Sequence, residues 1–246
     1  MNKIPKRLKK EPLIEAIWQV QFESPGAGDI LPGVLYTALK ARHPRIGLHR
    51  LPTADIPAPI AQIDPNLRFA AKVRIEEPDG RFLWQVGDRV VTMNCRKPYA
   101  GWSAFREEIL DLTQNIKTSG LVPQPQRHSL RYIDLLTLEP APDLSAFKLA
   151  MKLGDHEIRR HHLQMRLEIP DNECTHVVQI ATPAQVIFPE GMEEGSIVDI
   201  ETFSPENSVD WNAIATQIDY MHERSKALFF EHILTKQAIE QMEPEY

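Results

Sequence analysis

Two hydrophobic periods alternate along this chain of 246 residues, and their order constrains the fold more than any single motif does. Apolar residues at every second position indicate β-strands, and a period of three to four residues indicates helices. In the first half the order is strand, helix, two strands and helix, over residues 13–22, 30–43, 68–76, 81–95 and 103–119. In the second half the order is strand, helix, three strands and helix, over residues 128–138, 144–153, 161–169, 174–182, 196–203 and 211–233.

This order of elements predicts the α+β class. Consecutive strands joined by tight turns form antiparallel meanders, and helices then gather on one face of the sheet. We expect two similar strand-helix-meander-helix halves, over residues 11–120 and 128–246, the second ending in a long helix. A linker over residues 121–127 joins the halves, and a basic flexible arm over residues 1–10 precedes them.

Composition and charge exclude several function classes. The net charge of −6 argues against nucleic-acid binding through overall charge. Cys95 and Cys174 match no metal or redox spacing, so we expect reduced, buried thiols and no metal. No apolar run approaches the roughly 18 residues of a membrane helix, and no apolar segment follows the basic N-terminus. We therefore expect a soluble cytoplasmic protein with no membrane partner.

No catalytic motif is present in the sequence. The segment Gly26-Ala27-Gly28 lacks the third glycine and the lysine of a phosphate-binding loop. Neither a G-x-S-x-G elbow nor an H-E-x-x-H pair occurs. We therefore expect no cofactor and no catalysis; the alternative is a catalytic site assembled from dispersed residues such as Arg131, Asp134 and His162.

Three segments resemble one sporadically distributed bacterial protein family of unassigned function. The opening Lys10–Ala16 is similar to its K-x-P-L-x-E-A entry, and Leu130–Asp134 to its L-R-Y-I-N motif. The region from Trp211 to Thr235 resembles its closing helix. Asp134 stands where that family more often has asparagine. The resemblance covers nearly the whole chain, and a sporadic distribution implies a mobile or defence-linked module.

Arg131 and Asp134 are the first candidate binding residues. Both fall in the strand predicted over residues 128–138, and an arginine in a buried strand needs a carboxylate partner because an unpaired buried charge is costly. Arg131 and Asp134 point to opposite faces, since alternate residues of a strand do so. The arginine is therefore either one half of an ion pair or an anion-binding group.

Two further basic segments could contact an anion. The first segment joins a strand to a helix and contains Arg96, Lys97, Tyr99 and Trp102. Its aromatic rings could stack on nucleobases and its cations could bind phosphate at the start of the helix, or the rings could instead cover the core. Arg159 and Arg160 either lie in a solvated turn and strand edge or contact phosphate or nucleic acid from it. The adjacent His161 and His162 point to opposite faces, which disfavours a shared metal.

The end of the last helix carries more apolar surface than one core-facing stripe needs. We expect Phe229, Phe230, Ile233 and Leu234 to lie at a subunit interface, most simply that of a homodimer. The sequence thus favours a non-enzymatic binding or regulatory protein that acts through protein contact. The alternatives are a nucleic-acid-binding component of a phage-defence or toxin–antitoxin-like system, and an enzyme with a dispersed site.

Overall fold

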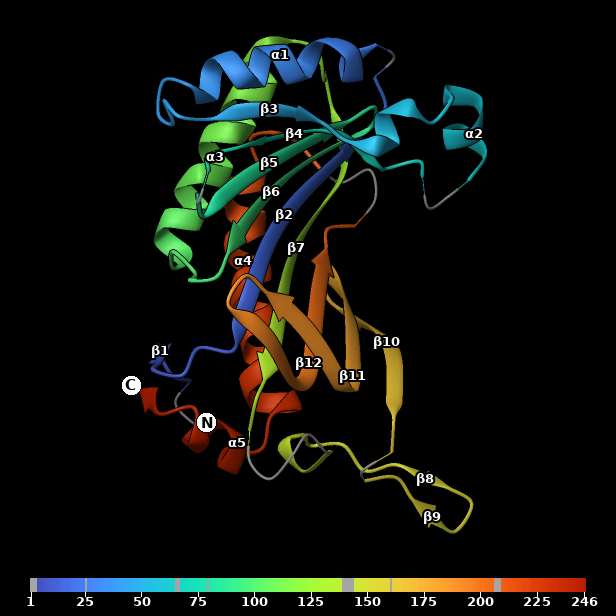
Figure 1. Cartoon of the computed structure of the whole chain (residues 1–246), viewed down its shortest axis with the longest axis vertical. Coiled ribbons are helices and arrows are strands. Elements are labelled where there is room, and N and C mark those ends of the chain that lie inside the picture. The colour runs from blue at the N-terminus through green and yellow to red at the C-terminus, as the bar shows by residue number, and fades with distance from the viewer. Residues whose placement is uncertain are drawn as a thin grey trace. The chain divides into compact units, whose positions relative to one another are not determined.

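The computed structural model describes residues 4–24, 26–64, 67–78, 80–138, 144–159, 161–205 and 209–246 (Figure 1). It confirms the α+β class, because the strands form a large antiparallel sheet and the helices do not alternate with parallel strands. The chain forms two compact units. One unit contains residues 15–130 and 203–219, and the other contains residues 1–14, 131–202 and 220–246.

The unit of residues 15–130 and 203–219 is built on a sheet with helices packed on it. Its strands are hydrogen-bonded in the order β7-β2-β6-β5-β4-β3. They are β2 (Leu13–Phe22), β3 (Gly47–Arg50), β4 (Ala71–Glu76), β5 (Phe82–Gly87), β6 (Val90–Arg96) and the start of β7 (Pro125–Leu136). The helices are α1 (Ala27–Leu39), α2 (Ala58–Ile63) and α3 (Trp102–Ser119), with a 3-10 turn over Pro52–Asp55.

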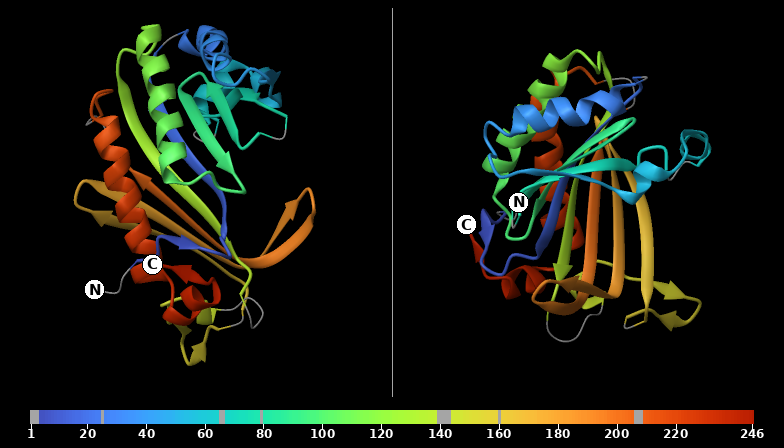
Figure 2. Two further views of the ribbon diagram at one scale, coloured as in Figure 1. Left: turned by 90° about the vertical axis from the view of Figure 1, so that its left-hand side faces the viewer. Right: turned by 45° about the horizontal axis from the view of Figure 1, so that its top comes forward.

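Strand alternation explains how this unit forms its core. The residues Ala16, Trp18, Val20 and Phe22 of β2 are completely buried, whereas the side chains between them are only partly buried. Helix α3 buries a matching stripe, which consists of Phe105, Ile109, Leu112, Thr113 and Ile116 together with Glu108. Helix α1 packs against α3. Figure 2 shows α3 lying along one face of the sheet.

The other unit continues from β7 with strands in the order β7-β12-β11-β10. These strands are β10 (Leu163–Asp171), β11 (Cys174–Phe188) and β12 (Gly191–Phe203), and short pairs are formed by β8 (Lys152–Leu153) with β9 (His156–Glu157) and by β1 (Arg7–Leu8) with β13 (Pro244–Glu245). Its helical segments are a 3-10 turn (Leu144–Ala146), the part of α4 (Ile214–Ala227) from Tyr220 onward, a π-helical turn (Leu228–Ile233) and α5 (Lys236–Gln241). Val178, Ile180, Val198, Ile200 and Phe229 belong to its apolar core.

The helix expected over residues 144–153 is wrong. Only Leu144–Ala146 forms a 3-10 turn, and Lys152 and Leu153 form strand β8. The backbone is drawn out of the helical conformation because Phe147 forms a bridge with Leu234 and the Lys148 N–H donates to the Ile233 carbonyl. The apolar spacing reflects burial of Leu144 and Phe147 in the core rather than a helical stripe.

Two helix ends also differ from expectation. The last helix does not run uninterrupted from Trp211 to Ile233, because α4 begins at Ile214 and passes into the π-helical turn at Leu228. Helix α3 begins at Trp102, one residue earlier than expected, after Gly101, whose positive φ of 86° suits glycine. Strand β7 begins at Pro125, inside the expected linker.

The basic N-terminal arm is docked from Lys6 onward. Arg7 and Leu8 pair with β13, and the backbone N–H groups of Lys6, Lys9 and Lys10 donate to carbonyls of residues 242–245. The Lys10 ammonium lies 3.0 Å from the Glu243 carboxylate. The expectation of a flexible arm over residues 1–10 is therefore corrected for residues 6–10, while residues 1–3 lie outside the described part of the chain. No helix within the described ranges has the length and apolarity to span a membrane.

Candidate functional site

Arg131 forms the ion pair that its position in β7 predicts. Its Nε lies 2.8 Å from Oδ1 of Asp199 on β12, and a second nitrogen reaches Oδ2. Gln179 of β11 donates to the same carboxylate at 3.3 Å. Asp199 is therefore satisfied by a cation and an amide from the two neighbouring strands, which makes this pair part of the sheet's internal structure.

Asp134 is not the partner of Arg131, and the pKa of its carboxyl is unusually high. Its side chain is buried, and burial raises its pKa from 3.8 to about 8, with smaller contributions from the negative charges of Glu11 and Asp199. A carboxyl with this pKa carries its proton at pH 7. The site thus favours a neutral side chain at pH 7.

The loop before α3 does not offer an exposed stacking surface. The rings of Tyr99 and Trp102 contact Phe105, with centroids 6.0 and 6.5 Å away, so both rings cover the core end of α3. Arg96 binds Glu76 at 2.9 Å, while Lys97 is exposed. These contacts match the structural interpretation of the segment rather than phosphate binding.

The charged segment before β10 contains an exposed ion pair. Arg159 lies 3.0 Å from Glu157, and both side chains are more than half exposed. His161 and His162 are exposed as well. Arg160 lies outside the described residues. Within the described ranges, these histidines are not part of any cluster of close metal-ligand atoms.

The expected interface at the end of the last helix is corrected for two of its four residues. Phe229 and Leu234 are buried in the core of their own unit, where the π-helical turn directs them, so neither has surface left for a partner. Phe230 packs against Phe229 with ring centroids 5.0 Å apart. Phe230 and Ile233 are partly buried against the same core.

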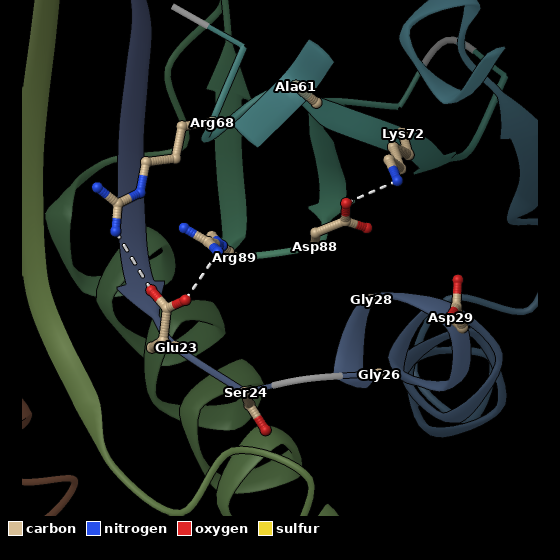
Figure 3. A pocket seen from close by; sticks show the side chains of 10 residues that line it. All are labelled: Glu23, Ser24, Gly26, Gly28, Asp29, Ala61, Arg68, Lys72, Asp88 and Arg89. Atoms are coloured by element: carbon tan, nitrogen blue, oxygen red, sulfur yellow. Dashed lines mark hydrogen bonds and ion pairs between the residues drawn. The ribbon is translucent and has the colours of Figure 1, made fainter. Parts of the chain in front are cut away.

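A polar pocket of about 370 Å³ lies at the N-terminal end of α1 (Figure 3). Arg68 and Arg89 converge on Glu23 at 3.3 and 2.8 Å, and Lys72 pairs with Asp88 at 2.7 Å. The first turn of α1 lies close to the backbone of Asp88, because a Cβ on Gly28 would lie 2.6 Å from the Asp88 Cα. Three acids, including Asp29, balance the three cations that line the pocket, so it has no net charge to attract an anion.

The most accessible feature that sequence reasoning missed is the outer edge of β10. This strand ends the hydrogen-bonding order, and within the described residues it pairs only with β11. Figure 1 shows it at the margin of the sheet. Leu167 is 46% exposed although it shares a face with Met165 and Ile169, which pack on the core. Periodicity identifies this strand but cannot reveal that it is an edge.

A second missed feature is a group of metal-ligand atoms where β10 turns into β11. Asp171, Cys174 and His176 each offer one ligand atom, and these atoms lie within 4.8 Å of one another. The D-x-x-C-x-H spacing is not a familiar metal motif, so the sequence alone gave no reason to group these residues.

Comparison with known proteins does not extend this description. No family model matches the chain, and no curated protein matches its sequence.

Proposed function

We propose that this protein is a non-enzymatic binding protein that acts through protein–protein contact and assembles as a homodimer across the edge of β10. The proposal rests on one observation, which is that the exposed edge of β10 is complementary to a second copy of itself. The link to a mobile or defence-linked module remains a prediction from the resemblance.

An exposed strand edge is a template for pairing with another strand, because its outward N–H and C=O groups have no partner in the sheet. Pro170 lies near the end of β10 and has no N–H, which suits a backbone position that faces away from β11. Backbone direction alternates along a strand, so Arg166 and Glu168 direct their backbone groups to the same side as Pro170.

Antiparallel pairing about a twofold axis at Leu167 makes this edge self-complementary. Residues equally far from the axis then face each other, so Arg166 of each copy lies opposite Glu168 of the other. Met165 lies opposite Ile169, and the two copies of Leu167 meet on the axis. Opposite charges therefore pair twice, and the apolar residues meet on the face that already carries the core.

In the monomer, neither the charge pairing nor the apolar contacts of this edge are complete. Arg166 and Glu168 form an ion pair of 2.7 Å within one copy, but both side chains are more than half exposed, so this pair contributes little. Covering the exposed half of Leu167 adds roughly 1 kcal/mol per copy, since full burial of a leucine is worth about 1.5–3 kcal/mol. Backbone hydrogen bonds along the edge add to this gain.

Charge reversal with rescue tests this proposal. The wild-type chain should show twice its mass of 28.1 kDa in light scattering at micromolar concentration. Glu168→Arg places arginines opposite each other and should yield monomers, whereas the double exchange Arg166→Glu with Glu168→Arg restores opposite charges and the dimer. A monomeric wild-type chain, or a double variant no more associated than the single one, contradicts the proposal.

We also infer that the strands of the two halves share one topology, although the second half lacks the helix expected over residues 144–153. The inference is supported by strand order: β2 is followed outward by β6, β5 and β4, and β7 is followed outward by β12, β11 and β10. In each half the last strand of the meander therefore pairs with the first strand of that half. An experimental structure in which residues 11–120 fail to superpose on residues 128–233 would contradict it.

A further inference from the structure

Three potential metal ligands from three different types of side chain meet at the turn between β10 and β11. Asp171 ends β10, and Cys174 and His176 lie two residues apart at the start of β11, so their side chains share one face. The His176 Nε2 lies 3.2 Å from the Asp171 Oδ2 and 3.9 Å from the Cys174 Sγ. Cys174 and His176 are buried, and Asp171 is partly accessible.

These spacings suit a small tetrahedral ion. With zinc bonds of about 2.3 Å to sulfur and 2.0–2.1 Å to nitrogen and oxygen, tetrahedral angles place sulfur about 3.6 Å from nitrogen, and nitrogen about 3.4 Å from oxygen. The separations of 3.9 and 3.2 Å each differ from these values by only a few tenths of an ångström. Thiolate, imidazole and carboxylate together are a ligand set typical of zinc.

The surrounding side chains already hold two of the ligands in place. The second nitrogen of His176, Nδ1, lies 2.8 Å from the Thr202 Oγ1, and Thr202 in turn contacts the Ser225 hydroxyl at 2.6 Å. Such a partner fixes the orientation of a metal-binding imidazole and leaves Nε2 for the ion. The Arg224 guanidinium donates hydrogen bonds to both carboxylate oxygens of Asp171, at 2.6 and 2.8 Å.

We propose that Asp171, Cys174 and His176 bind one zinc ion, with the fourth position open to water. The ion replaces the contact between His176 and Asp171, and Cys174 releases its thiol proton to solvent when its sulfur coordinates. Two anionic ligands then balance the charge of Zn²⁺. Arg224 is 44% exposed and retains the second oxygen of Asp171 as an outer partner.

Cobalt substitution tests the site, because a cobalt–thiolate bond absorbs in the near ultraviolet and the chain has only two cysteines. Cys95 provides a matched control, since it is equally buried but lies in the other unit and outside the ligand group. Metal-free wild-type protein and the Cys95→Ser variant should give the thiolate band at one equivalent of Co²⁺. The Cys174→Ser variant should not.

A second measurement keeps the result independent of any folding defect in a variant. One equivalent of Zn²⁺ should raise the melting temperature of the wild-type chain, and Thr202→Val should weaken zinc binding about 10-fold by releasing the imidazole. A wild-type chain with neither a cobalt–thiolate band nor a zinc-dependent rise in melting temperature overturns the proposal. A band that persists in Cys174→Ser also overturns it.

Discussion

Replacing Asp134 by asparagine should make the stability of this protein less dependent on pH. The carboxyl is buried on β7 near two other acids, Glu11 and Asp199, and holds its proton until about pH 8. Asparagine has nearly the same shape and no proton to lose in this range. The variant therefore removes one titration while it leaves the packing almost unchanged.

The direction of the effect follows from the two pKa values of Asp134. Between the unfolded value near 3.9 and the folded value of about 8, the folded chain binds a proton that the unfolded chain has released. The stability due to neutral Asp134 is complete below about pH 4 and is lost as pH rises toward 8. The loss is about 1.4 kcal/mol per pH unit, or about 3 kcal/mol between pH 5 and pH 7.

Urea unfolding of both proteins at pH 5, 6 and 7 measures this directly. The free energy of unfolding of Asp134→Asn minus that of wild type should rise by about 3 kcal/mol over this range, because contributions from all other groups cancel. Asp55→Asn, at an exposed site, controls for the chemical change itself. A difference that stays constant from pH 5 to pH 7 would refute the assignment of a neutral carboxyl to Asp134.

Two further predictions concern packing and the docked arm. Ile116→Ala in α3 should lower the free energy of unfolding, measured in urea, by about 2–5 kcal/mol because Ile116 is completely buried. The control Ile63→Ala, at a site 82% exposed, should change it by less than about 0.5 kcal/mol. Equal effects of the two substitutions would contradict the described core. Deleting residues 243–246 removes β13 and the Lys10–Glu243 ion pair, so trypsin should cleave at Lys6–Lys10 faster than in the full chain, and an unchanged rate would show that this pairing does not hold the arm.

Local patterns predict local structure well in this chain. The alternation from Leu13 to Phe22 and the apolar stripe of α3 identify their elements because burial follows the period of each. The helix prediction for residues 144–153 was wrong because the apolar residues of this segment are buried in the core while its backbone is largely non-helical. The spacing of apolar residues does not distinguish this arrangement from a helix.

Long-range features could not be predicted from the sequence. The partner of Arg131 lies 68 residues away on β12, and naming it requires the strand order. The π-helical turn buries Phe229 and Leu234, which an ideal helix would leave partly outside one stripe. The group of Asp171, Cys174 and His176 likewise depends on the register of β10 with β11 and on Thr202, 26 residues beyond His176.

Disulfide trapping at Leu167 tests the proposed dimer most directly, because it reports both association and register. In a chain with Cys95→Ser and Cys174→Ser, Leu167→Cys places the two thiols on the twofold axis, where opposing Cα atoms lie about 4.5–5.5 Å apart and can form a disulfide. Gln164→Cys is the matched control, since its two copies would be about 20 Å apart in this register. The proposed dimer predicts rapid oxidation of Leu167→Cys to a covalent dimer and little for Gln164→Cys; equal, slow cross-linking of both would contradict it.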